Sequence, residues 1–376
     1  MKKIQMVDLK TQYEKISGEI DAAIKEVILG STFINGPQVK AFQADLENYL
    51  GVKYVIPCAN GTDALQIAMM ALGLKPGDEV ITADFTYVAT AETIALLGLT
   101  PILVDVNPET FCIDVEAVAK VISPKTKAIV PVHLFGQCAD MDPIMALAAK
   151  HNLFIIEDTA QALGADYTSA NGKKSKAGTI GHVGCTSFFP SKNLGCFGDG
   201  GALYTNDDEL AKKIRMIANH GQSVQYVHDS IGVNSRLDSI QAAILKVKLQ
   251  YLNEYASARQ GVAAFYDKAF ANHPALQIPV RAKNSTHVFH QYTLQLKGVD
   301  RAKLREHLQS QGIPAMIYYP IPLHLQKAYL NPRYKAGSFP VTEKLCSSVL
   351  SLPIHTEMDL DTMEYISKSV LEFINQ

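Results

Sequence analysis

Short apolar runs alternate with helical patterns through the first half of the chain. Between the runs, apolar residues recur three and four positions apart, as they do in amphipathic helices. Strands that alternate with helices are typical of a mostly parallel sheet covered by helices on both faces. The sequence therefore predicts an α/β fold with strands at 54–57, 79–83, 101–105, 128–132, 154–157 and 185–189, and helices at 63–72, 89–97, 115–121 and 141–151.

The ends of the chain have a different pattern. Amphipathic helices are predicted at 12–29 and 39–50, and a long helix at 237–255. Beyond that helix, 290–296 alternates as a half-exposed strand does, and 301–311 has helical spacing. We therefore expect a large α/β domain at 13–254 and a smaller α+β domain made of 1–12 and 255–376.

Charge and cysteine content exclude several classes of protein. The chain has 35 basic and 37 acidic side chains and no basic block, so nucleic acid is not expected as a partner. Its six cysteines are scattered without a Cys-x-x-Cys pair or a His/Cys cluster, which indicates free thiols in a reducing compartment and no metal site. The first residues are polar and no 18 apolar residues run uninterrupted, so we expect no signal peptide, no membrane span and a cytoplasmic location.

Unusual polar and glycine residues stand where the predicted strands end. Ligands of parallel sheets bind at the carboxyl ends of the strands. The sequence therefore predicts a site at this edge of the sheet, and the candidates are Gly61, Thr62, Tyr87, His133, Asp158, Gln161, Ser187 and Lys192.

Lys192 stands in a glycine-rich turn after the apolar run 185–189 and Pro190. A lysine at the end of a buried strand loses hydration, so its pKa falls and the neutral amine becomes a nucleophile toward an aldehyde. A simple solvated turn is the alternative interpretation of this segment alone.

Asp158 stands at the exit of the apolar strand Phe-Ile-Ile-Glu-Asp. A carboxylate there is costly unless it meets a cation or hydrogen-bond donors, and a protonated pyridine nitrogen is one such cation. The alternative is an N-cap for a following helix.

The segment Cys-Ala-Asn-Gly-Thr-Asp-Ala-Leu opens the helix 63–72. Unpaired N–H groups at a helix start attract phosphate, and the hydroxyls of Thr62 and Ser187 could add donors. A plain N-cap by Asn60 or Thr62 is the alternative. Tyr87 could stack on a planar ring, or it could belong to the core or to an interface. His133 is interpreted as a hydrogen-bonded histidine at a strand end rather than as a catalyst.

Several longer motifs together resemble the DegT family of nucleotide-sugar aminotransferases, which are fold-type I enzymes that depend on pyridoxal 5′-phosphate (PLP). The motifs extend in register from residue 7 to about residue 326. They are VDLKTQY, CANGTDAL, DEVITADFTYVATAE, KAIVPVHLFGQCADMD, IIEDTAQALGA, SFFPSKNLGCFGDGGAL, GVNSRLDSIQAAIL and YYPIPLHLQ.

The resemblance implies a role for each candidate. Lys192 would condense with the PLP aldehyde and then carry a proton between the substrate and the cofactor. Asn234 would reach the phosphate of the cofactor in the neighbouring subunit, which implies a homodimer with shared active sites. The remaining roles would be Asp158 at the pyridine nitrogen, Gln161 at the ring hydroxyl, Tyr87 on the ring face, and Gly61, Thr62 and Ser187 at the phosphate.

Within the family, the chain is most similar to enzymes that aminate UDP-2-acetamido-2-deoxy-3-oxo-glucuronate for lipopolysaccharide (O-antigen) sugars, with L-glutamate as the expected donor. Arg236 is then expected to bind the sugar carboxylate through its guanidinium, the alternative being a salt bridge at a helix start. Tyr318 and His324 are the candidate substrate residues of the loop YYPIPLH, and Tyr318 departs from the histidine expected there.

A 3- or 4-keto deoxysugar linked to dTDP or UDP is the alternative substrate, and a non-catalytic regulatory protein with the same fold is the alternative of a different class.

Overall fold

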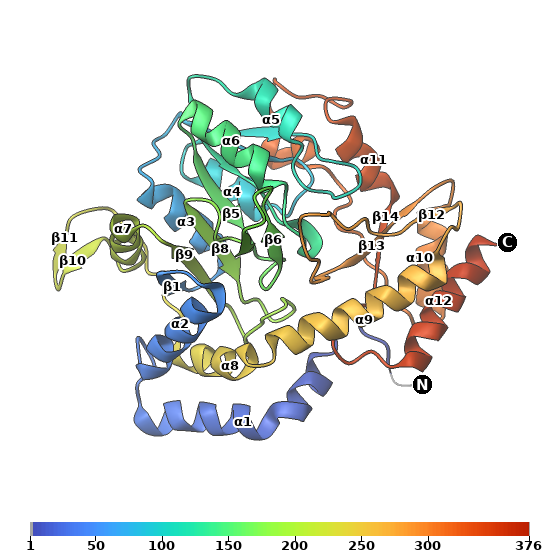
Figure 1. The fold of residues 1–376 in the computed structure, drawn as a ribbon, viewed down its shortest axis with the longest axis horizontal. Coiled ribbons are helices and arrows are strands. Elements are labelled where there is room, and N and C mark those ends of the chain that lie inside the picture. The colour runs from blue at the N-terminus through green and yellow to red at the C-terminus, as the bar shows by residue number, and fades with distance from the viewer. Residues whose placement is uncertain (1–2, 376) are drawn as a thin grey trace.

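The computed structural model describes residues 3–375. A seven-stranded sheet forms its centre, and a three-stranded sheet lies beside it (Figure 1). The order of strands in the large sheet is β1-β9-β8-β5-β4-β2-β3. Neighbouring strands are parallel, except that β9 is antiparallel to both β1 and β8. This arrangement confirms the predicted mostly parallel sheet. Its strands are β1 (Tyr54–Cys58), β2 (Glu79–Ala83), β3 (Thr100–Val104), β4 (Thr126–Val130), β5 (Phe154–Asp158), β8 (Val183–Ser187) and β9 (Gly201–Thr205).

Helices cover both faces of this sheet because successive strand residues point to opposite sides. Ile81 and Ile129 join one buried cluster, whereas their neighbours Val80 and Val130 join another. The first cluster includes residues of α5 and α6, and the second includes residues of α3, α4 and α7. These helices are α3 (Gly61–Ala71), α4 (Ala89–Leu96), α5 (Val115–Val121), α6 (Met141–His151) and α7 (Asp208–Ala218).

The predicted helix 237–255 is wrong, because the structure has two helices there, α8 (Ser239–Leu249) and α9 (Leu252–Phe270). Ile244 and Val247 of α8 pack against Ile16 and Ile20 of α1 (Leu9–Gly30). α9 instead leads to a separate core. The apolar periodicity continues across the break, so it could not reveal that the two pieces pack in different places. α2 (Pro37–Leu50) also packs on α8.

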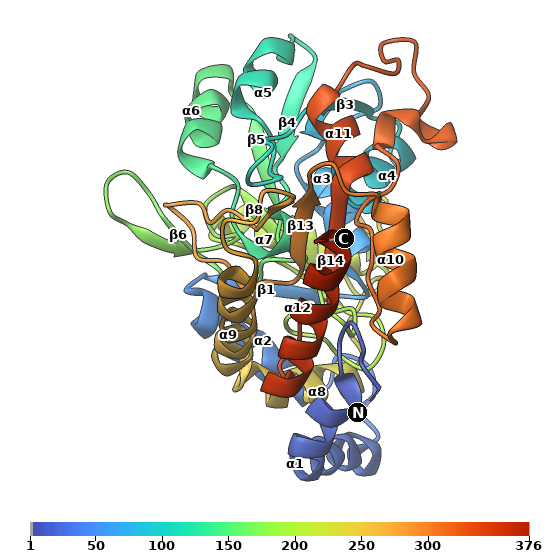
Figure 2. The ribbon, with the colours of Figure 1, turned by 90° about the vertical axis from the view of Figure 1, so that its right-hand side faces the viewer.

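The second core lies around β12 (Leu276–Gln277), β13 (Tyr292–Leu296) and β14 (Val349–Leu352), which are antiparallel. Residues of α9, α10 (Arg301–Ser310) and α12 (Leu360–Ile374) complete it, and α11 (Pro340–Ser348) lies toward β3 and β4 (Figure 2). Ile4 packs on this core, so the first described residues join the C-terminal part of the chain. The predicted domain limits stay a prediction, and the limit at residue 254 falls inside α9.

Three expectations about the whole chain can be compared with the described residues. All six cysteines are buried and free, as predicted. Within residues 3–375, no helix is long and apolar enough to cross a membrane, and no cluster of potential metal ligands is found.

Candidate active site

A cavity of about 860 Å³ opens at the carboxyl ends of the parallel strands. Its walls come from the start of α3, the segments that follow β2, β5 and β8, and two segments of the C-terminal part of the chain. Eight of the candidate residues line it: Gly61, Thr62, Tyr87, Asp158, Gln161, Ser187, Lys192 and Tyr318.

Lys192 is held in a tight turn after β8. Its backbone N–H donates to the Phe189 carbonyl at 2.8 Å, and Gly195 approaches the Pro190 carbonyl so closely that a Cβ would collide with it. Burial lowers the pKa of Lys192 to about 8, although the nearby Asp158 carboxylate opposes this shift. The turn therefore presents an amine that is partly neutral near physiological pH.

Asp158 lies at the end of β5 with 7% of its surface exposed. Its carboxylate accepts hydrogen bonds from the Thr90 hydroxyl at 2.9 Å and from the Ala160 N–H at 3.1 Å. These donors hold the side chain in place, and it forms no ion pair with a residue in the described part of the chain. No helix follows Asp158 directly, so its alternative role as a helix N-cap is wrong.

The start of α3 has a capped helix end and a small hollow beside it. Asn60 caps the helix by accepting from the Asp63 N–H at 2.8 Å, which confirms the N-cap alternative for that residue. Gly61 lies against Ser187, and a Cβ on Gly61 would stand 2.7 Å from the Ser187 Cβ. Gly61, Thr62 and Ser187 therefore line one small hollow at a helix N-terminus, where an anion is favoured.

Two tyrosines form an aromatic wall. Tyr87 is 58% exposed and its ring lies 6.2 Å from that of Tyr319, so the interpretation of Tyr87 as a core residue is wrong. The amide of Gln161 accepts from the Phe135 N–H at 2.7 Å and donates to the Tyr319 hydroxyl at 3.1 Å. Gln161 thus orients Tyr319 at the cavity.

Sequence reasoning missed Thr90 and Tyr319. Thr90 lies in the first turn of α4, and no local pattern indicates that its hydroxyl reaches a carboxylate 68 positions away. Tyr319 adjoins the candidate Tyr318, but its bond to Gln161 joins residues 158 positions apart.

Four candidates lie outside the cavity: Asn234, Arg236, His324 and His133. Asn234 is exposed and Arg236 partly exposed, and both flank Ser235, whose hydroxyl accepts from the Ala59 N–H at 3.0 Å. His324 is fully buried and bonded to Asp84, so a direct substrate contact by His324 is not supported by its position.

His133 is a buried hydrogen-bonded residue. Its Nε2 lies 2.9 Å from Glu157, and its Nδ1 accepts from the Ala139 N–H at 3.1 Å. This placement agrees with the structural interpretation of the histidine.

The lowered pKa of Lys192 predicts how its reaction with a small aromatic aldehyde depends on pH. Only the neutral amine reacts, so the labelling rate should rise about tenfold per unit below pH 8 and level off above it. Reductive trapping followed by peptide mass spectrometry measures this rate at Lys192 alone. A rate that keeps rising steeply to about pH 10 would contradict the shift.

The same shift affects stability. Between the folded pKa of about 8 and the unfolded value near 10.4, the unfolded chain binds more protons. The free energy of unfolding of the ligand-free protein should therefore rise with pH over this interval, relative to a Lys192→Met variant.

Comparison with known proteins gives consistent matches over the whole chain. The model of the DegT/DnrJ/EryC1/StrS aminotransferase family matches residues 14–371. UDP-2-acetamido-2-deoxy-3-oxo-D-glucuronate aminotransferase from Pseudomonas aeruginosa is 48% identical over 363 residues, which cover 96% of this chain and 98% of that protein. dTDP-3-amino-3,4,6-trideoxy-alpha-D-glucose transaminase from Streptomyces venezuelae is 40% identical over 357 residues, covering 95% of this chain and 92% of that protein.

A solved structure of NtdA from Bacillus subtilis with bound cofactor PMP, the amine form of PLP, superposes with a TM-score of 0.91. It is 33% identical and covers 100% of this chain and 86% of that chain.

Proposed function

Because the chain belongs to the DegT/DnrJ/EryC1/StrS aminotransferase family, whose cofactor is PLP, we propose that it moves an amino group from L-glutamate to the keto group of UDP-2-acetamido-2-deoxy-3-oxo-glucuronate. In this proposal the product serves lipopolysaccharide or O-antigen biosynthesis in the cytoplasm. The observation that carries the proposal is that Lys192, with a pKa lowered to about 8, and the buried carboxylate Asp158 line one cavity.

The residues of the cavity fit PLP. The hollow of Gly61, Thr62 and Ser187 at the start of α3 offers N–H and hydroxyl donors and no Cβ at its closest point, as a phosphate requires. Asp158 offers a buried carboxylate to a protonated ring nitrogen, and Lys192 offers an amine to the aldehyde. When bound, PLP supplies an electron sink for a substrate carbanion.

Lys192 is the residue that we expect to move the proton. With a pKa of about 8, its amine can accept a proton from a substrate carbon and return it near physiological pH. Thr90 and the Ala160 N–H hold the side chain of Asp158 in place with two hydrogen bonds, so that it can face the ring nitrogen. Tyr87 lies where its ring face can cover one side of the cofactor.

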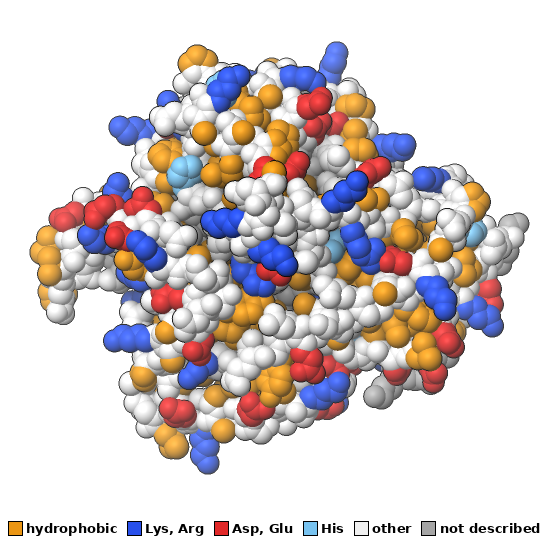
Figure 3. Space-filling model, in the orientation of Figure 1, with side chains coloured by type: hydrophobic (Ala, Val, Ile, Leu, Met, Phe, Trp, Pro, Cys, Tyr) orange, Lys and Arg blue, Asp and Glu red, His pale blue; other side chains and the backbone are white. Residues whose placement is uncertain are grey.

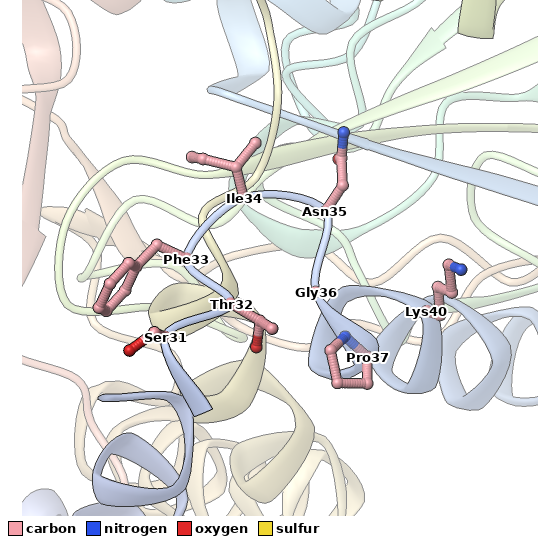
Figure 4. Close-up of a pocket in the computed structure, with 8 residues that line it drawn as sticks. All are labelled: Ser31, Thr32, Phe33, Ile34, Asn35, Gly36, Pro37 and Lys40. Carbon is pink, nitrogen blue, oxygen red and sulfur yellow. The ribbon is translucent and has the colours of Figure 1, made fainter. Parts of the chain in front are cut away.

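Homodimerisation completes the proposed site. Asn234 and Arg236 do not line the cavity of their own chain, which suits residues that act across a subunit interface. The loop between α1 and α2 lies beside them, since the Ser239 N–H donates to the Phe33 carbonyl at 2.9 Å. This loop borders an open hollow of about 610 Å³. The side chains of Ile34 and Asn35 extend from the same side of the loop (Figure 4).

The hairpin of β10 (Gln222–Val224) and β11 (Val227–His228) supports the same interface. It projects from the molecule with hydrophobic side chains at its end (Figure 3). Val224 is 66% exposed and Tyr226 is 84% exposed in the hairpin, and Ile231, three residues beyond β11, is 86% exposed, so several apolar side chains here face water. We therefore propose that a second copy covers the hairpin.

The substrate test is a panel of UDP- and dTDP-linked keto sugars with glutamate as donor. We expect the largest kcat/KM for UDP-2-acetamido-2-deoxy-3-oxo-glucuronate, and the yellow colour of the loaded enzyme should bleach reversibly with glutamate. A preference for a dTDP-linked 3- or 4-keto deoxysugar would favour the alternative, which the Streptomyces venezuelae relative supports. No bleaching with any donor would favour a regulatory protein.

Arg236 tests the recognition of the sugar carboxylate. Arg236→Ala should lower kcat/KM for the uronate about 30-fold and for a matching neutral sugar less than about threefold, because only the uronate loses a charge-assisted bidentate contact. Arg215→Ala is a matched control, since Arg215 stacks on Tyr54 at 5.4 Å and does not line the cavity. Equal losses on both sugars would contradict this role.

A further inference from the structure

A buried pair of titratable side chains lies behind the cavity wall. Nδ1 of His324 is 2.6 Å from the carboxylate of Asp84, and both side chains are fully inaccessible to solvent. The backbone joins the same residues: the His324 N–H donates to the Asp84 carboxylate at 2.8 Å, and the Leu323 N–H donates to the Asp84 carbonyl at 3.3 Å. Asp84 therefore forms three hydrogen bonds with Leu323 and His324.

Each partner is close in sequence to an aromatic residue of the cavity. Asp84 is fixed at the end of β2, where its N–H donates to the Val104 carbonyl at 2.9 Å, and it precedes Tyr87 by three residues. His324 follows Tyr319 by five residues, and two prolines stiffen the chain between them. The rings of Tyr87 and Tyr319 lie 6.2 Å apart and form the aromatic wall. The contact between Asp84 and His324 therefore connects the two chain segments that carry these tyrosines.

The opposite edge of His324 faces a second carboxylate. Nε2 of His324 is 3.3 Å from Glu343, which also accepts from the Gly337 N–H at 2.7 Å. The ring of Phe339 packs edge-on against the imidazole at 4.9 Å. Burial raises the pKa of Asp84 to about 6, and the neighbouring His324 opposes this shift.

Other charged groups near this pair are bonded elsewhere. Asp105 accepts from the Thr342 N–H at 2.8 Å, and Arg333 pairs with Glu79 at 3.1 Å. Leu323 and Phe339 bury the remaining surface. The imidazole of His324 is therefore the side chain that bonds residues 318–325 to Asp84 at the end of β2, beside the backbone bonds of Leu323 and His324.

We propose that His324 is a positioning residue that clamps the segment 318–325 to Asp84 and thereby sets the distance between Tyr87 and Tyr319 for the nucleotide sugar. The inference rests on the proposed function for its substrate class. It replaces the expected direct contact between His324 and the substrate. Glutamate is small and reacts beside Lys192, whereas a nucleotide sugar must also occupy the outer part of the cavity.

The direct measurement is hydrogen exchange of the peptide that contains the Leu323 and His324 amides. We expect His324→Phe, which fills the ring volume without a donor, to speed exchange there at least about tenfold. His324→Asn keeps an N–H near the position of Nδ1 and should restore most of the protection. Asp84→Asn is the second variant, and it should speed exchange in the same peptide if His324→Phe does not fold.

Kinetics then separate positioning from other roles. In His324→Phe, KM for the nucleotide sugar should rise about tenfold, while the half-reaction with glutamate and the binding of PLP change less than about twofold. Lys327→Ala, an exposed change two residues beyond the segment 318–325, is the matched control and should leave exchange and KM unchanged.

Two other outcomes overturn the inference. A higher KM with unchanged exchange would mean that His324 contacts the substrate directly. Equal losses in both half-reactions and in PLP binding would mean a general structural role. If no keto sugar reacts with the unaltered protein, the proposed function fails, whereas the exchange experiment still reports whether the clamp exists.

Discussion

Replacement of Lys192 by alanine is expected to lower kcat for amino transfer by at least about 10⁴-fold, because under the proposed function the chain would lose both the amine that condenses with PLP and the base that moves the proton. Lys192 is the lysine that lines the cavity within residues 3–375, where burial lowers its pKa to about 8. Treatment with borohydride should fix the cofactor to the unaltered chain and leave it exchangeable in Lys192→Ala.

A second buried lysine in the chain makes this experiment specific. Burial also lowers the pKa of Lys248 to about 8, but its ammonium donates to the Gly195 carbonyl at 2.6 Å and does not line the cavity. Peptide mapping should therefore find the reduced cofactor on Lys192 and none on Lys248. Label on Lys248, or label that persists in Lys192→Ala, would contradict the assignment.

Mixed dimers of Lys192→Ala and Asn234→Ala should regain about half of the activity of the unaltered dimer once the heterodimer is isolated. If Asn234 acts on the cofactor of its partner, both changes fall on one of the two sites and the other site is intact. Asn234 is exposed and does not line the cavity of its own chain, which is the basis for this expectation.

The matched control pairs the unaltered chain with a Lys192→Ala, Asn234→Ala double variant. Under the same hypothesis this heterodimer has no intact site, so its activity should be at least about tenfold lower than that of the first heterodimer. If the control heterodimer were the more active of the two, Asn234 would act on the cofactor of its own chain, and the hypothesis of a shared site would be wrong.

The order of strands and helices could be predicted because it depends on local periodicity. The parallel strands and the helices between them follow from the apolar runs, and the ends of the strands indicated where Asp158 and Lys192 would meet. Two limits of this reasoning are visible. β9 was not predicted, and the break between α8 and α9 has no local signal, since it depends on which cores the two helices join.

Sequence alone thus determined the fold class and the chemistry of the candidate site, because the residue types at strand ends and their spacing are local properties. Tertiary structure decided which side chains support that chemistry. Thr90 reaches Asp158 across 68 positions, Tyr319 reaches Gln161 across 158, and His324 reaches Asp84 across 240. Such contacts depend on how strands and loops pack against one another, and no local pattern of residues contains that information.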